Sequence, residues 1–221
     1  MSAPIFLSLT LRLAIAGASC VVTAAALGGN KPAPPTVTPG DAVLCADAAR
    51  TTERARGFPL GVMRAVAIAE SGRPVNKGQA RIAWPWTVTA GGSGRYFATK
   101  AAAIAHVRAL RRDGVRSIDV GCMQINLRYH PRAFESLDKA FDPERNAAYA
   151  GDFLARLHEK SRSWSRALAF YHSGDPVKGS RYRRRVEKLW NSERERLFEQ
   201  ARQSRILAFR ARRAARLARS R

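Results

Sequence analysis

Helical periodicity covers most of this chain and is broken at one place, and this arrangement constrains the fold more than any other feature. Amphipathic patterns bounded by residues typical of helix ends are found at 41–56, 59–70, 99–114, 142–160 and 164–171. Residues 81–97 instead carry aromatic and β-branched side chains around Gly91-Gly92, which predicts a β-hairpin. Residues 117–127 are a short β-prone or irregular run. The predicted class is mainly α with one small β-hairpin insertion.

The C-terminal segment is strongly basic and rich in helix formers. The chain has 221 residues, with 39 Lys and Arg against 17 Asp and Glu, a formal net charge of +22. Residues 178–221 hold 16 of these basic residues and only four acidic ones, which predicts a long basic C-terminal helix. We expect its first half to dock on the domain through an imperfect apolar stripe, and its end, from Arg202, to be solvated. The stripe consists of Leu189, Trp190, Leu197, Phe198 and Leu207.

The N-terminus has the features of an export signal. Residues 13–27 contain no charge, follow Arg12, and are shorter than the roughly 20 residues that span a bilayer. Because the small residues at 24–26 suit cleavage, we expect a signal peptide over 1–26 and an exported, periplasmic protein; without cleavage, the segment would anchor the protein in the membrane. The proline-rich residues 27–40 predict an extended linker.

Loss of the signal peptide would leave two cysteines, Cys45 and Cys122. In an oxidising compartment two thiols commonly pair, so a disulfide between them is expected. The alternative is two separate buried thiols. Neither cysteine has the neighbours of a zinc site, and the four scattered histidines have no metal-ligand spacing. We expect no metal and no cofactor.

Glu70 is a candidate general acid. It ends the apolar helix pattern Val66-Ala67-Ile68-Ala69, and two tryptophans follow in the hairpin. A carboxyl group in such surroundings would lose solvation, which raises its pKa towards the value that a general acid needs at neutral pH. The alternative is an ordinary helix-terminal glutamate in solvent or in a salt bridge.

Residues 121–126 are a candidate sugar-binding segment. They place the amides of Gln124 and Asn126 in an apolar run, after a glycine, Gly121, that permits close backbone approach. Amides both donate and accept hydrogen bonds, which suits a neutral ligand rich in hydroxyl and acetamido groups. For Asn126, a purely structural role in capping buried backbone is an alternative.

Three motifs in this order resemble the pattern of SLT-type lytic transglycosylases, which cleave peptidoglycan and are related to goose-type lysozyme. The motifs are Glu70-Ser71-Gly72, Gly121-Cys122-Met123-Gln124-Ile125-Asn126, and Phe170-Tyr171-His172-Ser173-Gly174. The resemblance covers about residues 41–177 and implies a lysozyme-like α+β catalytic domain there, followed by an Arg-rich helical tail over 178–221. The third motif departs from the family, which usually has Ala and Asn where this chain has Phe170 and His172.

The resemblance implies a role for each matching residue. Glu70 would be the catalytic acid and base, and Ser71, Met123 and Gln124 would line the cleft beside the scissile bond. Tyr171 would orient Glu70 or contact an N-acetyl group, and His172 would lie in the same site. Trp86, at the hairpin, would stack on a sugar or else pack in the core.

The number of carboxylates separates two mechanisms. Hydrolytic glycosidases generally need two flanking carboxyl groups, and Asp119 is the obvious second candidate. If Asp119 faces away, attack by the sugar's own C6 hydroxyl is the natural solution for a single acid, and it gives 1,6-anhydro-N-acetylmuramic acid ends. The resemblance implies the same reaction, with the β-1,4 bond between N-acetylmuramic acid and N-acetylglucosamine as its target.

Other functions and partners follow from the same residues. Alternatives are a lysozyme-type hydrolase using Asp119, a non-catalytic peptidoglycan-binding adaptor of a secretion or flagellar machine, and a nucleic-acid-binding protein using the Arg-rich helix. Export argues against nucleic acid. We expect a monomer that acts on peptidoglycan glycan strands, with the basic tail drawn to anionic envelope components or to a secretion or flagellar complex.

Overall fold

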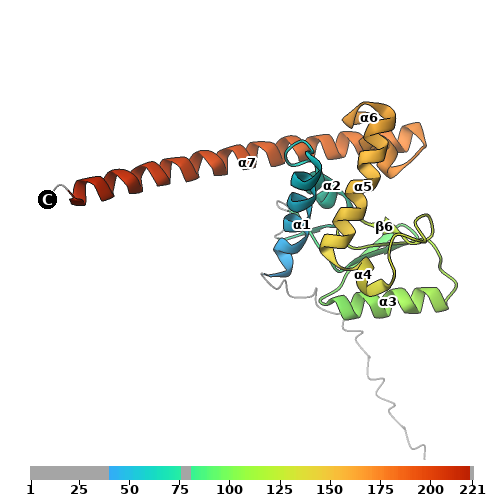
Figure 1. Ribbon diagram of the computed structural model, residues 1–221. Coiled ribbons are helices and arrows are strands. Elements are labelled where there is room, and N and C mark those ends of the chain that lie inside the picture. Colours follow the sequence, from blue (N-terminus) through green and yellow to red (C-terminus); the bar gives the residue numbers. More distant parts are fainter. Residues whose placement is uncertain (1–39, 76–80, 220–221) are drawn as a thin grey trace, which may run out of the picture. The chain divides into compact units, whose positions relative to one another are not determined.

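The computed structural model describes residues 40–75 and 81–219 (Figure 1). The predicted signal peptide, and the linker up to residue 39, lie outside the described residues. The helices are α1 (Asp41–Arg56), α2 (Val62–Ser71), α3 (Lys100–Arg112), α4 (Leu137–Ala140), α5 (Pro143–Ser161), α6 (Trp164–His172) and α7 (Pro176–Arg219). The strands are β1 (Gly72–Pro74), β2 (Arg81–Ala83), β3 (Thr87–Ala90), β4 (Ser93–Tyr96), β5 (Ile118–Val120) and β6 (Ile125–Asn126). The mainly α, lysozyme-like class predicted from the sequence is confirmed.

Local capping explains where most helices begin and end. The side chains of Thr99, Asp142 and Ser163 accept hydrogen bonds from backbone amides in the first turns of α3, α5 and α6. Gly57 ends α1 in the left-handed conformation, with φ of 62°.

Helix α2 starts later than the sequence predicted. Its first helical residue is Val62 and not Pro59, because Gly61 takes a positive φ of 84° just before it. The buried carboxylate of Glu53, on α1, accepts hydrogen bonds from the amides of Gly61 and Met63 at 3.1 and 2.7 Å. A side chain from another helix therefore supplies the cap that the local sequence lacks.

The strands form more than the single hairpin predicted from the sequence. The hairpin is present as β3 and β4, but it belongs to a four-stranded antiparallel sheet of order β4-β3-β5-β6. Residues 117–127 supply β5 and β6, and Thr89 pairs with Asp119 across the sheet. Strands β1 and β2 make a separate antiparallel pair. The pairing of β3 with β5 joins segments remote in sequence, so a local pattern does not reveal the four-stranded sheet.

Two apolar clusters hold these elements together. The larger is built by helices α1, α2, α5, α6 and the first part of α7. The second lies between the sheet and α3, and it contains Trp84 and Trp86. Trp86 is only 8% exposed, so the prediction that it stacks on a sugar is wrong and the alternative, packing in the core, is correct. The Trp84 indole donates a hydrogen bond to the Phe97 carbonyl at 2.7 Å. This bond joins the residues that precede β3 to the residue that follows β4.

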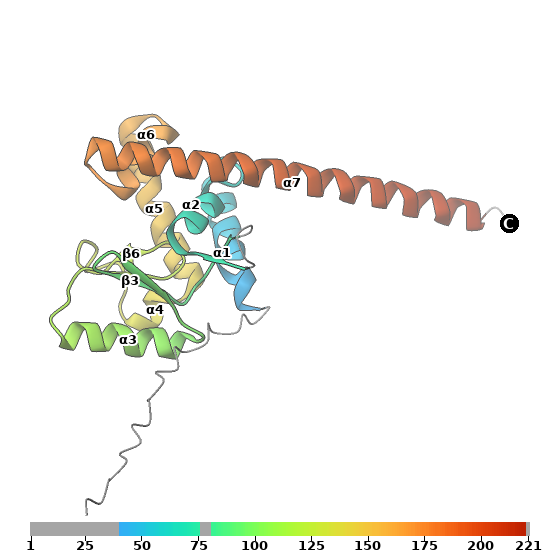
Figure 2. The ribbon, with the colours of Figure 1, turned by 180° about the vertical axis from the view of Figure 1, so that it is seen from behind.

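The long basic helix α7 consists of two different parts. Its beginning packs against α2 and α6, as both views show (Figures 1 and 2), and buries Tyr182 and Val186 in the larger cluster. From Glu199 to Arg219 nearly every side chain is exposed. None of the helices in the described part of the chain is long and apolar enough to cross a membrane.

Candidate active site

A cleft of about 670 Å³ lies between the sheet and the helical part of the domain. Its wall is built by the end of α2, strands β3, β5 and β6, the segment after β6, α5, the end of α6 and the first part of α7. The lining side chains that can carry a charge include those of Glu70, Asp119, His130, His172 and Arg185. Aromatic side chains, including those of Tyr129, Phe153 and Phe170, line the rest.

Glu70 lies at the end of α2 and faces this cleft. The helix before it is apolar and buried, as the sequence suggested, and carries the carboxyl group into a poorly solvated position. Burial raises the pKa of Glu70 to about 7, although the nearby Tyr182 hydroxyl lowers it. The charge of Asp119 raises the pKa further, and the Arg185 guanidinium lowers it. Glu70 can therefore hold a proton at neutral pH and release it, as a general acid must.

Asp119 faces the same cleft, so the condition that would have left Glu70 as the single carboxyl group there is not met. Its carboxylate accepts a hydrogen bond from the Asn126 amide at 2.8 Å, across the β5–β6 pair. Burial raises the pKa of Asp119, while the Asn126 hydrogen bond and the charge of His172 lower it. The charges of Glu70 and Asp119 interact directly.

The segment between β5 and β6 is held from behind by Asn146. This buried side chain of α5 accepts a hydrogen bond from the Met123 amide at 2.8 Å and donates to the carbonyls of Val120 and Ala140. Gly121 has a φ of 82°, and a Cβ there would lie 2.5 Å from the Asn146 amide nitrogen. Only glycine allows the segment to turn this close to α5.

The predicted disulfide between Cys45 and Cys122 is present and ties this segment to α1. The hydroxyl of Ser71 lies 2.8 Å from the Cys122 carbonyl, which also ties the segment to the end of α2. Residues 121–124 are thus fixed to three helices, and their backbone cannot shift without disturbing the core.

Gln124 lines the cleft and contains an unpaired buried acceptor. It has a positive φ of 48°, and its amide nitrogen donates to the carbonyls of Thr87 and Gly121 at 3.1 and 3.0 Å. These bonds fix the orientation of the amide, and its oxygen, Oε1, is buried without a hydrogen-bond partner among the described residues. An unpaired buried acceptor is costly, and a donor group of a ligand or water that reached it from the cleft wall would relieve that cost.

Asn126 has the structural role that the sequence left open. Its amide nitrogen donates to Asp119 and to Ser117, and its oxygen accepts from the backbone amides of Arg128 and Tyr129. The side chain lies on the cleft wall, but its hydrogen-bonding groups are already engaged. It positions Asp119 and the turn after β6.

Three aromatic rings from α6 and α7 lie beside Glu70. Tyr171 lines the cleft, but its hydroxyl donates its hydrogen bond to the Met123 carbonyl at 3.0 Å and not to Glu70. The Tyr182 hydroxyl lies close enough to Glu70 for the two groups to interact, and it is buried without a hydrogen-bond partner among the described residues. The ring of His172 stacks on Tyr182, with centroids 4.6 Å apart and planes at 5°. Burial and the charge of Arg185 lower the pKa of His172, against the effect of Asp119.

The structure separates the predicted site residues into two groups. Glu70, Gln124, Asn126, Tyr171 and His172 meet in the cleft. Ser71 and Met123 were expected beside the scissile bond and Gly121 in the sugar-binding segment, but all three are buried and do not line the cleft; their backbone or hydroxyl groups hold the shape of its wall. Their contribution to a site is positioning. Trp86 belongs to the second core and not to the cleft.

Sequence reasoning missed Tyr182 and Arg185. Both fall in the segment interpreted as a basic tail, and the apolar stripe through which its first half was expected to dock began only at Leu189. The sequence does contain a pattern that predicts this packing, because Tyr182, Val186 and Leu189 follow a helical spacing of four and three residues. Among residues 40–75 and 81–219, no group of three His, Cys, Asp or Glu side chains could hold a metal ion.

A helical body beside a small antiparallel sheet, with a glutamic acid of raised pKa in the cleft, defines a lysozyme-like domain. The sequence model of the transglycosylase SLT domain matches residues 47–191, and the chain belongs to this family. The match confirms the resemblance seen in the three motifs, and it ends inside α7, beyond Tyr182 and Arg185. No curated protein and no solved structure matches the chain. The family implies peptidoglycan as the substrate.

Proposed function

We propose that this protein is a lytic transglycosylase that cleaves the β-1,4 bond between N-acetylmuramic acid and N-acetylglucosamine. Glu70 acts as both acid and base, and the product has a 1,6-anhydro end. The observation that carries the proposal is the position of Glu70 in the cleft, where burial raises its pKa to about 7. The family supplies the class of substrate.

The reaction needs two proton transfers at one side chain. Protonated Glu70 donates its proton to the glycosidic oxygen as the bond to C1 of N-acetylmuramic acid breaks. The resulting carboxylate then takes the proton of the C6 hydroxyl, whose oxygen forms the new bond to C1. Glu70 ends protonated, ready for another cycle. A pKa near 7 suits both transfers, because neither form of the side chain is strongly favoured at neutral pH.

The remaining groups of the cleft suit an amino sugar. The free acceptor of Gln124 can take a hydrogen bond from an acetamido N–H or a hydroxyl group. Exposed aromatic rings, such as Tyr129 and Phe170, offer flat apolar surfaces to sugar faces. Tyr182 and Arg185 adjust the proton affinity of Glu70 from the side of α7.

Asp119 favours a second candidate, a hydrolase of the lysozyme type. It lines the same cleft as Glu70, and a two-carboxylate glycosidase needs a second carboxyl group in its active site. Activation of a water by Asp119 would give a reducing end in place of the anhydro ring. In a transglycosylase, the same negative charge would stabilise the positive charge that develops at C1.

The proposal includes an exported protein whose catalytic domain starts at 41 and, in place of the boundary at 177 expected from the sequence, continues into the first part of α7, with the basic tail formed by the exposed remainder of that helix. The disulfide supports export, because disulfides persist in oxidising compartments. The seven arginines between 202 and 219, with no acid among them, support an attraction of the tail to anionic envelope components.

Mass spectrometry of the fragments released from purified peptidoglycan tests the reaction. We would compare the mature protein with Glu70→Gln and Asp119→Asn variants. Products one water lighter than hydrolysis products, lost with Glu70→Gln and retained with Asp119→Asn, are the expected result. Reducing ends that disappear with Asp119→Asn would identify a hydrolase. Activity that survives Glu70→Gln would remove Glu70 from the mechanism, and no release by any form would leave an adaptor that only binds.

A further inference from the structure

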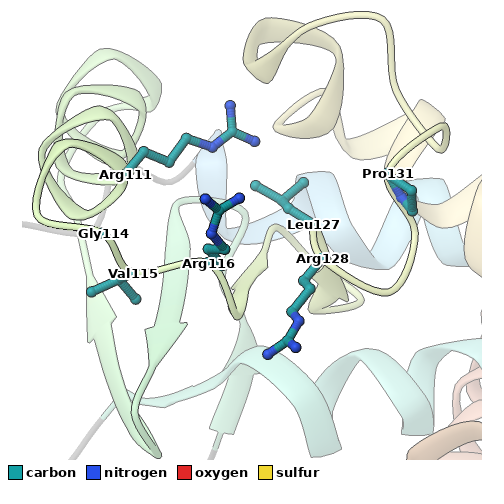
Figure 3. A pocket seen from close by; sticks show the side chains of 7 residues that line it. All are labelled: Arg111, Gly114, Val115, Arg116, Leu127, Arg128 and Pro131. Carbon is teal, nitrogen blue, oxygen red and sulfur yellow. The ribbon is translucent and has the colours of Figure 1, made fainter.

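A second hollow lies outside the catalytic cleft, at the end of α3. It encloses about 470 Å³ and is lined by Arg111, Gly114, Val115, Arg116, Leu127, Arg128 and Pro131 (Figure 3). None of these residues belongs to the cleft wall. The family motifs do not include them either.

Three separate segments bring arginines to this hollow. Arg111 lies in the last turn of α3, Arg116 precedes β5, and Arg128 follows β6. In Figure 3 the side chains of Arg111 and Arg116 extend into the same space, and Arg128 extends away from them. Two guanidinium groups therefore share one space, and the third arginine lines the hollow with its guanidinium directed away from that space.

These arginines have no negative partner within the described residues. No acidic side chain lines the hollow, and none of the three forms a salt bridge there. Unneutralised guanidinium groups that share one space repel each other and favour an anion, above all a carboxylate or phosphate that each can bind through two hydrogen bonds. Val115, Leu127 and Pro131 add apolar wall, which suits a ligand with both carboxylates and small apolar groups.

One segment separates this hollow from the catalytic cleft. Along residues 126–131, Asn126, Tyr129 and His130 line the cleft, whereas Leu127, Arg128 and Pro131 line the hollow. A single backbone segment therefore contributes to the walls of both spaces. The Arg128 guanidinium carbon lies 5.8 Å from the centre of the Tyr129 ring, which places this cation next to the cleft.

We propose that this arginine hollow binds carboxylates of the peptide that branches from a peptidoglycan strand held in the cleft. The proposal rests on the proposed function, which supplies the substrate. Such a peptide carries free carboxylates and small apolar side chains, the chemistry that the hollow offers. A branch of about five residues can extend roughly 17 Å, which is enough to cross a wall one segment thick.

The test compares two triple variants of equal charge. The first, Arg111→Gln with Arg116→Gln and Arg128→Gln, removes the cations of the hollow. The control, Arg108→Gln with Arg112→Gln and Arg132→Gln, removes three exposed arginines from the same neighbourhood that do not line it. Arg112 shares the last turn of α3 with Arg111, so both triples also remove one charge from the same helix end.

Kinetics on three substrates distinguish the sources of the carboxylate. The substrates are glycan strands with peptides, strands with peptide carboxyls converted to amides, and strands stripped of peptides, which expose the lactyl carboxylate of the sugar. We expect the first triple to raise KM at least fivefold on peptide-bearing strands, with kcat unchanged, and to equal the wild type on the other two. An equal rise of KM in both triple variants would overturn the proposal and show that only the net charge of the protein matters. A loss that persists on stripped strands would overturn it in favour of the lactyl group.

A binding measurement separates this proposal from the proposed reaction. Peptides released from peptidoglycan by an amidase would be titrated into the Glu70→Gln protein and followed by NMR. Shifts centred on residues 111–131, absent with the first triple, are the expected result, and they do not depend on turnover. Shifts absent from this segment, with the protein folded, would overturn the hollow as a peptide site. Failure of the reaction itself would instead show as no Glu70-dependent cleavage of any strand.

Discussion

The two halves of α7 have similar compositions but opposite relations to the rest of the protein. Both are basic and rich in helix formers. The first half buries Tyr182 and Val186, and its Trp190 indole donates to the Leu60 carbonyl at 2.8 Å. The second half, from Glu199, is exposed along its described length.

The difference shows that neither charge nor helix propensity decides whether a helix packs. What distinguishes the first half is an apolar residue at nearly every turn on one side, together with the buried Glu193, which pairs with the partly exposed Arg64. In the second half the large apolar residues, such as Leu207 and Phe209, are scattered among arginines around the helix. The catalytic domain therefore includes the start of α7, and the family match to residue 191 agrees.

Truncation tests the comparison most strongly. A chain that lacks 176–221 exposes the faces of α2 and α6 that α7 covers, and we expect it to show no cooperative thermal unfolding. A chain that lacks 200–221 loses no side chain that is buried among residues 200–219, and its Tm should stay within about 2 °C of the full length. Circular dichroism on heating measures both. Cooperative unfolding of the shorter chain near the Tm of the full protein would show that α7 is an appendage.

The next largest effect on stability is expected from one of a matched pair of alanine substitutions. Val186→Ala leaves a cavity in the larger core and should lower the free energy of unfolding by about 2 kcal/mol. Leu207→Ala, at a side chain that is 63% exposed, should change it by less than about 0.5 kcal/mol. Urea denaturation gives both values, and equal effects would remove the distinction between the halves.

The ion pairs of the two halves should also contribute differently to the free energy of unfolding. Glu193 is 9% exposed and lies 2.5 Å from Arg64 and 2.8 Å from Arg196, so Glu193→Gln should cost about 1 kcal/mol by leaving Arg64 uncompensated. Glu199 pairs with Arg202 in solvent, and Glu199→Gln should leave the urea midpoint unchanged. A larger loss at Glu199 than at Glu193 would contradict this order.

The smallest expected effect is a change in pH dependence. The Tyr182 hydroxyl lowers the pKa of Glu70, so Tyr182→Phe should raise that pKa above about 7. Glu70 then keeps its proton to higher pH, and the falling limb of the kcat–pH profile should shift to higher pH. Phe209→Leu, in the second half of α7, should leave the profile in place. A downward move in Tyr182→Phe would mean that Tyr182 does not stabilise the Glu70 carboxylate.

Local sequence predicted the helices well because their caps are local. Thr99, Asp142 and Ser163 mark helix starts without any knowledge of the fold, and the end of α1 at Gly57 needs only a left-handed residue. The pKa of Glu70 was also foreseeable, since the apolar residues that desolvate it precede it directly on its own helix.

Long-range contacts explain what the sequence did not predict. Asn146 anchors the segment at Gly121 from another helix, and no local pattern marks an asparagine for that role. The direction of Asp119 was readable in part, because it alternates with the buried residues Ile118 and Val120 and so lies on the opposite face of β5. What faces it there depends on the pairing of β5 with β3 and β6.

The Cys45–Cys122 bond closes a covalent ring that contains Glu70, Asp119 and most of the sheet. A protease that cuts the backbone once inside this ring cannot release a fragment, because the two new ends belong to pieces that the sulfur bridge still joins. Such a nicked protein would keep its mass, apart from one added water, and would separate into two pieces on a denaturing gel only after a thiol reductant is added.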